Sequence, residues 1–432
     1  MSKGISRRQL LQGVALTAAL GVETRGVSSL ACVALGPRKE ESAPDTLVVL
    51  FLRGGADGLN IIVPYGDDDY YKLRPNLALS PPSSGAARSS KALKLDSFFG
   101  LHPAMSSLLP IYQDGNLLPV HAVGSFDHTL SHFQAMAAME RGLANDGPGA
   151  ASGWLARHLN STEVPGQSPL RSVALSETLP ASLRGATQAT SLTSLANYEV
   201  HLPTGTGGLQ FHADERRQAM EQTLAQLYSG PQTGDLADAG KGTLAALDAV
   251  RRLDPSHYHP TPGVHYPKTG LSHALQQVAC MVKGAIGLEV ACIDVEGWDT
   301  HVDQGRDTGW QPARLTDLAT SLAAFYRDMG NQMHNVTVVT MTEFGRRAYE
   351  NTGLGTDHGR ASVMLVMGGA VKGGRVLANW PGLNPHQLVG PGDLHVTTDY
   401  RDILGELVAK RLHNSRLDLV FPNHTPHFHG IV

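Results

Sequence analysis

The sequence predicts an α/β protein built on a doubly wound, mostly parallel sheet. Apolar and β-branched runs of strand length, such as residues 47–52 and 336–343, are typical of central parallel strands that are covered on both faces. Stretches with helical spacing separate these runs, and strands that alternate with helices form parallel sheets with helices on both faces. Polar turns follow several of the runs, which is where open α/β sheets keep their chemistry.

The expected elements follow one another in a regular order. Strands are expected at residues 47–52, 117–123, 288–294 and 336–343. Helices are expected at residues 101–113, from residue 132 to Gly142, and at 213–227, 242–253, 271–287, 312–329 and 397–411. Residues 65–100 and 257–266 are rich in turn-forming residues and are expected to be loops. We therefore expect one domain over residues 45–430, with loop and helical insertions at roughly 143–265.

The N-terminus has the pattern of a twin-arginine export signal. Arg7 and Arg8 precede a modest apolar run at residues 14–22, which is too short to span a bilayer. Residues 29–31 offer a cleavage site of small residues, so we expect a signal peptide at 1–31 and a periplasmic or secreted protein. Cys32 leaves open a lipoprotein alternative. The twin-arginine translocase carries folded proteins, so a metal could be loaded before export.

Composition excludes several classes of partner. A formal net charge of −4 argues against nucleic acid or an anionic membrane, because binding to either needs clustered Lys and Arg. No stretch after residue 40 has the length and hydropathy of a transmembrane helix. The three cysteines are too few for a disulfide scaffold, although a bridge between Cys280 and Cys292 is open outside the cytoplasm.

Acidic residues and histidines follow the predicted strands. The residues concerned are Asp57, the pair Ser131 and His132, the pair Asp299 and His301, Glu343, and the pair Asp357 and His358. Each alone has an ordinary explanation as a turn former or helix cap. Parallel strands bring their carboxyl ends to one edge of the sheet, and carboxylates gathered there would repel one another without a cation. The pattern therefore predicts a site for one or two divalent metal ions, of zinc, manganese or calcium.

Several motifs also resemble a known family. They are residues 53–58 (RGGADG), 297–301 (GWDTH), 342–346 (TEFGR) and 355–360 (GTDHGR), together with the twin-arginine leader. On these motifs the chain resembles, over residues 45–430, the bacterial family catalogued as domain of unknown function fifteen-oh-one. That family is in turn similar to the alkaline phosphatase and sulfatase superfamily, which implies an alkaline phosphatase-like fold.

The resemblance to the superfamily implies roles for individual residues. The implied metal ligands are Asp57, Asp299, His301, Asp357 and His358, together with Glu343, which occupies the end of the late strand. Ser131 is the implied nucleophile at a helix N-terminus, with Thr129 as the alternative hydroxyl and His132 beside it as the alternative catalytic group. Arg53 and Arg346 would bind the substrate's non-bridging oxygens. A third metal-binding histidine could come from the C-terminal part of the chain, at His386, His395, His424, His427 or His429.

We therefore expect an exported, metal-dependent hydrolase or transferase that acts on a phosphate or sulfate ester of a small molecule or polysaccharide. The alternative is a catalytically degenerate relative that binds a sugar, an anion or a partner protein. A third hypothesis is a metal-dependent carbohydrate-active enzyme with His132 as its base.

Overall fold

The computed structural model describes residues 45–145, 150–162, 167–200, 213–228 and 234–432. The predicted signal peptide and Cys32 lie outside the described residues. Everything below concerns the unit that contains residues 43–432.

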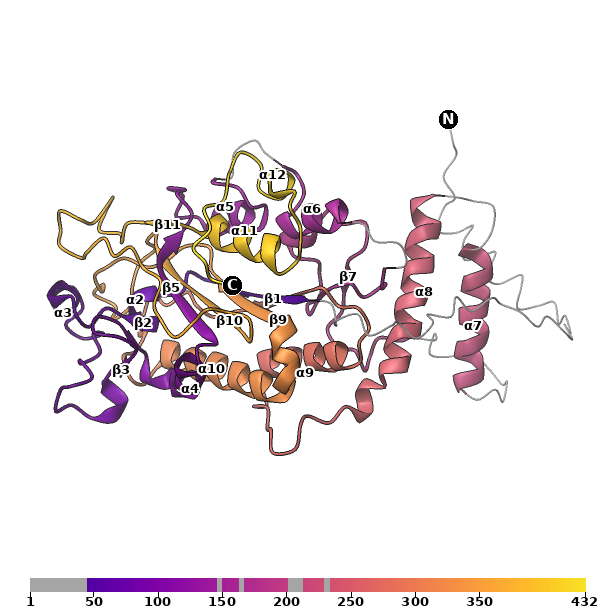
Figure 1. Cartoon of the computed structure of the whole chain (residues 1–432), viewed down its shortest axis with the longest axis horizontal. Helices are drawn as coiled ribbons and strands as arrows, with labels where there is room; N and C mark the ends of the chain where they lie inside the picture. Colours follow the sequence, from indigo (N-terminus) through magenta and orange to yellow (C-terminus); the bar gives the residue numbers. More distant parts are fainter. Residues whose placement is uncertain (1–44, 146–149, 163–166, 201–212, 229–233) are drawn as a thin grey trace, which may run out of the picture. The chain divides into compact units, whose positions relative to one another are not determined.

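An eight-stranded sheet forms the centre of this unit, in the order β11-β5-β10-β9-β1-β8-β6-β7 (Figure 1). All neighbouring pairs in this sheet are parallel except those of β10, which runs antiparallel to both β5 and β9. The prediction of a mostly parallel sheet is therefore confirmed. The strands are β1 (Thr46–Leu52), β5 (Leu117–Gly124), β6 (Ser172–Ala174), β7 (Thr190–Ser191), β8 (Val290–Val295), β9 (Val336–Met341), β10 (Ser362–Gly368) and β11 (Thr398–Asp399).

Helices cover both faces of the sheet, so the fold is doubly wound. The alternating side chains of β1 show this directly, because Val48 and Leu50 enter one apolar core and Val49 and Phe51 enter another. The first core packs against α4 (Leu109–Gln113), α8 (Asp235–Leu253), α9 (Gly270–Lys283) and α10 (Trp310–Met329). The second packs against α5 (His132–Glu140), α6 (Trp154–Ser161), α11 (Tyr400–Lys410) and α12 (Leu417–Val420) (Figure 1).

The remaining elements are short. A small antiparallel sheet consists of β2 (Ile62–Val63), β4 (Gly100–Leu101) and β3 (Leu93–Lys94). Strand β3 lies within residues 65–100, the segment expected to be loop, and β2 and β4 lie at the two ends of that segment. The other α-helices among the described residues are α2 (Gly58–Ile61), α3 (Asp68–Leu73) and α7 (Ala213–Tyr228). The described residues also form five short 3₁₀ helices: η1 (Arg88–Ser90), η2 (Pro103–Leu108), η3 (Ala181–Leu183), η4 (Pro255–His257) and η5 (Gly330–Asn335). The segment expected to be an insertion supplies β6 and β7, which extend the main sheet beyond β8. Two or three residues are too few to show a strand period in the sequence.

The carboxyl ends of β1, β5, β8 and β9 point to the same edge of the sheet, because these strands are mutually parallel. Strand β10 runs the opposite way, so its amino end lies at that edge. The connection that precedes β10 contains Asp357 and His358. This connection therefore lies at the same edge of the sheet as the connections that follow the parallel strands.

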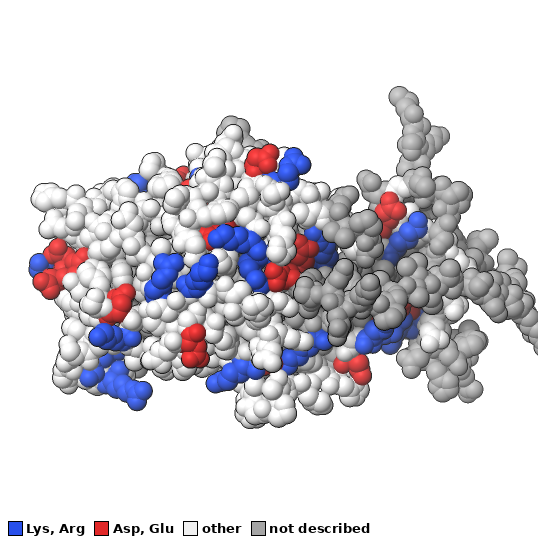
Figure 2. All heavy atoms as spheres, in the orientation of Figure 1, with Lys and Arg blue, Asp and Glu red and all other residues white. Residues whose placement is uncertain are grey.

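Charges are mixed on the face of the protein that Figure 2 shows. Figure 2 shows Lys and Arg intermingled with Asp and Glu over the visible face, without a field of a single sign. None of the helices among the described residues is long and apolar enough to cross a membrane.

Cys280 and Cys292 are both free and buried, so the disulfide left open by the sequence is not formed.

Candidate metal centre

His132 is the first residue of α5, and a hydrogen bond to Glu343 fixes the orientation of its ring. Its Nδ1–H donates to Oε1 of Glu343 at 2.7 Å, since a carboxylate can only accept. The buried Glu343 also accepts from the backbone N–H of Gly54 at 2.8 Å. The hydrogen bond and charge of Glu343 raise the pKa of His132 above its ordinary value. With Nδ1 engaged, Nε2 of His132 faces Oδ2 of Asp299 at 3.6 Å.

Asp299 lies in the connection after β8 and is fixed by Arg346. Arg346 is almost fully buried and donates to Oδ1 of Asp299 at 2.6 Å, and to the carbonyls of Gly55 at 2.6 Å and Thr356 at 2.8 Å. Partial burial raises the pKa of Asp299, but the hydrogen bond and charge of Arg346 outweigh it and hold that pKa below its ordinary value. Gly54 allows the close packing, because a Cβ there would lie 2.5 Å from the backbone nitrogen of Asp299.

His301 and His358 are held in the same manner as His132. Nδ1 of His358 donates to the backbone carbonyl of Leu130 at 2.8 Å, and Nδ1 of His301 lies 3.2 Å from Oδ1 of Asp357. In the neutral tautomer that these contacts fix, each ring offers Nε2 as its acceptor, and the two Nε2 atoms are only 2.9 Å apart. Burial lowers the pKa of His358, which favours its neutral form. Two facing lone pairs at this distance repel each other unless a cation or a proton lies between them.

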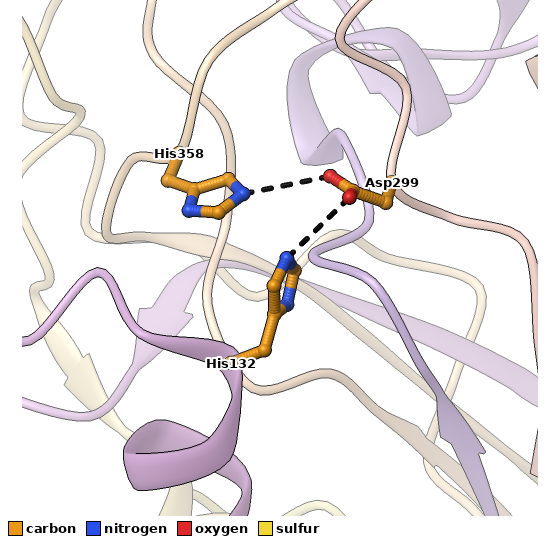
Figure 3. A group of neighbouring side chains, drawn as sticks. All are labelled: His132, Asp299 and His358. Carbon is orange, nitrogen blue, oxygen red and sulfur yellow. Dashed lines mark ion pairs between the residues drawn. The ribbon is translucent and has the colours of Figure 1, made fainter.

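His132, Asp299, His301 and His358 turn their ligand atoms toward one another. Figure 3 shows three of them, His132, Asp299 and His358. Ligand atoms of His132, Asp299 and His358 all lie within 4.8 Å of one another. Oδ1 of Asp299 lies 3.5 Å from Nε2 of His358 and 3.2 Å from Nε2 of His301. Ligands bonded tetrahedrally to zinc at about 2.0–2.1 Å are separated by about 3.3 Å. The contacts of 2.9–3.6 Å in this group fit such a site.

Ligand orientation is also typical of metal sites. Histidines that bind a metal usually donate their second ring N–H to a carboxylate or a backbone carbonyl, which fixes the tautomer and the ring. Glu343, Asp357 and the carbonyl of Leu130 fill that role for the three histidines. A possible metal site of His and Asp therefore exists in the structure.

The structure divides the predicted site residues into groups. Four of them meet at the centre: His132, Asp299, His301 and His358. Glu343, Asp357 and Arg346 surround these and hold them. Ser131 is the N-cap of α5, next to His132, and its hydroxyl makes no capping hydrogen bond. Of the C-terminal histidines, His424 contacts Asp402 of α11 instead of the central group.

Asp57 is not brought into this group. Its carboxylate is buried and forms a two-point ion pair with Arg74, with distances of 2.5 and 2.9 Å. One oxygen also accepts from Nε2 of Gln304 at 2.6 Å. Three donor contacts leave little of this carboxylate for a metal, so its place is structural.

Arg53 is likewise engaged within the protein. Its guanidinium pairs with Glu140 at 2.9 Å and with Asp294 at 2.8 Å, and it lies 3.9 Å above the ring of Phe51. Arg346 donates to Asp299 and to backbone carbonyls. Both arginines that were predicted to bind substrate, Arg53 and Arg346, therefore have partners within the protein.

Three supporting groups had no signal in the sequence. Asn351 donates to Oδ1 of Asp357 at 3.0 Å and to the carbonyl of His301 at 3.0 Å. The buried Gln304 accepts from the hydroxyls of Thr300 and Thr356, which precede His301 and Asp357. The third group is the backbone carbonyl of Leu130, which any residue at that position would supply. These contacts join residues of separate loops, so they can be recognised only from the folded structure.

The family of the chain is shown by comparison with family models. Residues 44–405 match the model described as "Protein of unknown function (DUF1501)". The chain belongs to this family. The resemblance seen in the sequence motifs is thereby confirmed. No curated protein matches the chain.

Among solved structures, the chain is similar to the C-terminal periplasmic domain of EcEptC from Escherichia coli, solved in complex with Zn. The two share 9% sequence identity, with 76% of this chain and 74% of that chain covered and a TM-score of 0.30.

Proposed function

We propose that this protein is an exported metalloenzyme that hydrolyses or transfers a phosphate or sulfate ester. The observation that carries the proposal is the convergence of three imidazole Nε2 atoms and one carboxylate, with each Nδ1 occupied by an acceptor. Export rests on the twin-arginine pattern of residues 6–22.

Zinc suits these ligands best. Nitrogen-rich sets with one carboxylate are typical of zinc, whereas calcium takes six to eight oxygens. His132, Asp299 and His358 would hold the ion, with His301 as a fourth ligand. A bound ion would supply positive charge to the ester oxygens and lower the pKa of an attacking hydroxyl. The exposure of Asp299 and His301, at 49% and 40% of their side chains, leaves the centre open to a substrate.

Charge around the centre favours an anionic substrate. Three carboxylates and two guanidiniums surround the imidazoles: Asp299, Glu343, Asp357, Arg346 and Arg347. This set carries one excess negative charge, which a divalent cation converts into one excess positive charge. The first-turn backbone N–H groups of α5, to which the side chain of Ser131 provides no cap, add positive potential beside His132. A phosphate or sulfate ester matches this environment.

Ser131 is the proposed nucleophile. It adjoins His132 at the N-terminus of α5, and its hydroxyl is not used as a cap. In the proposed reaction the hydroxyl oxygen forms a bond to phosphorus or sulfur, the bond to the ester oxygen breaks, and the departing alcohol takes up a proton. A second displacement by water or by an acceptor alcohol would then release Ser131, giving hydrolysis or transfer.

The experiment is a turnover assay of zinc-loaded protein with p-nitrophenyl phosphate and p-nitrophenyl sulfate. We expect His358→Ala to abolish turnover, and Ser131→Ala to lower kcat by at least about a hundredfold without loss of metal. His128→Ala is the matched control, because His128 is exposed on the same connection and should not matter. Full activity of Ser131→Ala would remove Ser131 from the mechanism. Loaded protein that turns over neither ester would contradict the hydrolase proposal.

One observation favours the second candidate, a non-catalytic anion-binding or sugar-binding protein. Arg53 and Arg346 both have partners within the protein, so neither is available to stabilise the charge that develops on an ester's oxygens in a transition state. Under this alternative, the zinc-loaded protein would bind phosphate or sulfate with no turnover of either ester.

A further inference from the structure

Exposed apolar side chains lie on the connections that carry the proposed metal ligands. Eight large apolar side chains are exposed in the described part of the chain, and five of them lie on the connections that also carry the ligands or at the start of the helices that follow. These five residues, here called the apolar rim, are Phe126, Phe133, Val302, Trp310 and Leu354. Phe133 is 86% exposed directly after His132, and Val302 is 71% exposed directly after His301. Several exposed apolar side chains on connections that meet at one edge of a sheet are typical of a binding surface.

Backbone contacts join part of the apolar rim. The backbone N–H of Asp303 donates to the carbonyl of Gly353 at 2.9 Å, and that of Gln304 donates to the carbonyl of Leu354 at 3.0 Å. A Cβ placed on Gly353 would lie 3.5 Å from Cγ2 of Val302. The segments that carry Val302 and Leu354 therefore lie side by side, next to His301. Trp310 is tied to the same connection, because its Nε1 donates to the carbonyl of Gly297 at 2.6 Å.

Leu354 is also held in an unfavourable backbone conformation. Its φ is +56°, in the left-handed region that glycine adopts easily and a leucine does not. Its neighbours Gly353 and Gly355 are glycines, yet a half-exposed leucine occupies the strained position. Strain of this kind persists at functional sites. Packing within the protein does not account for the side chain, because 49% of the residue is exposed.

We propose that the ligand of this centre is an amphiphile: an anionic ester group lies at the metal site, and an alkyl or aryl group of the same molecule rests on the apolar rim. The inference rests on the proposed function and names its substrate class. The charge of the centre is complementary to an anionic head group. Contact between the apolar rim and the alkyl or aryl group removes apolar surface from water, which stabilises the complex.

The test is calorimetric titration of the zinc-loaded protein with matched short-chain and long-chain ligands: ethyl and octyl phosphate, and ethyl and octyl sulfate, all below their micellar concentrations. For the head group that binds, we expect the octyl ester to bind at least tenfold more tightly than the ethyl ester. Burial of about two methylene groups suffices for that ratio.

Three variants locate the effect. Phe133→Ser combined with Val302→Ser should reduce the octyl-to-ethyl ratio below threefold and leave the affinity for the ethyl ester unchanged. Leu354→Gly should also lower the ratio while the midpoint of thermal unfolding stays level or rises, because glycine relieves the strain. Leu419→Ser is the control, since Leu419 is 41% exposed on α12, away from the ligand-bearing connections, and should not change the ratio.

Equal affinity of ethyl and octyl esters for the parent protein would overturn the inference and leave the proposed head-group site standing. A ratio that survives in the double variant would also overturn it, because the apolar contact would then lie elsewhere. If no ester of either length binds the loaded protein, the proposed function itself fails.

Discussion

At the scale of single residues, the centre is defined by which nitrogen of each histidine is occupied. Nδ1 of His132 and His301 faces a carboxylate, and Nδ1 of His358 faces a carbonyl. The acceptors thus determine that all three rings offer Nε2. In the proposed centre, Glu343 acts on the metal through its hydrogen bond to His132.

Replacing Glu343 by Gln tests this role. The substitution keeps the shape of the side chain and removes the charge that supports His132, so zinc affinity should fall about 10- to 100-fold. Competition with a chromophoric chelator measures that affinity. The exposed Glu177, changed to Gln, is the control and should leave it unchanged. Complete loss of zinc would instead indicate that Glu343 is a direct ligand, and an unchanged affinity would show that His132 is not bound to the metal.

At the scale of elements, the connections at one edge of the sheet bring the site together. The prediction that carboxylates and histidines would gather past the strand ends could be made from the sequence, because parallel strands share one edge. The direction of β10 could not be predicted, yet it places Asp357 and His358 at that edge. Nor could the partner of Asp57, because Arg74 lies 17 residues away beyond the short helix α3, in a segment with no clear periodicity.

The ion pair between Asp57 and Arg74 gives a prediction for these connections. Both side chains are fully buried, so Arg74→Met leaves an uncompensated carboxylate and should lower the free energy of unfolding by about 3–5 kcal/mol. Urea denaturation measures the loss, and zinc content should stay that of the parent. Arg88→Met, at an exposed site, should change neither quantity. Should the variant keep its stability and lose zinc, Asp57 would belong to the metal site after all.

At the scale of the whole molecule, two buried histidines connect folding to pH. His102 donates from Nε2 to the carbonyl of Arg306 and accepts the N–H of Ala104 on Nδ1. His121 donates to the carbonyl of Ile62 and accepts the N–H of Ala122. Burial lowers the pKa of each to about 4, because a charged ring would lose its hydration inside the protein. A protonated ring would also turn an N–H toward the backbone N–H that Nδ1 now accepts.

The sign of the effect follows from linkage. An unfolded histidine takes up its proton near pH 6.5, but these two resist protonation down to about pH 4 in the folded state. Their contribution is therefore complete above pH 6.5 and is lost as the pH falls from 6.5 to 4, by up to about 1.4 kcal/mol per pH unit for each residue. Urea denaturation across this range should show the slope, and the double variant His102→Gln, His121→Gln should flatten it. An identical slope in the variant would contradict the assignment.

The most direct test of the metal centre is elemental analysis of the purified protein after zinc loading and removal of free metal. We predict about one equivalent of zinc in the parent and in His128→Ala, and none in His358→Ala or Asp299→Ala, with all four proteins folded. Absence of zinc from the parent, or its retention by both ligand variants, would contradict the account.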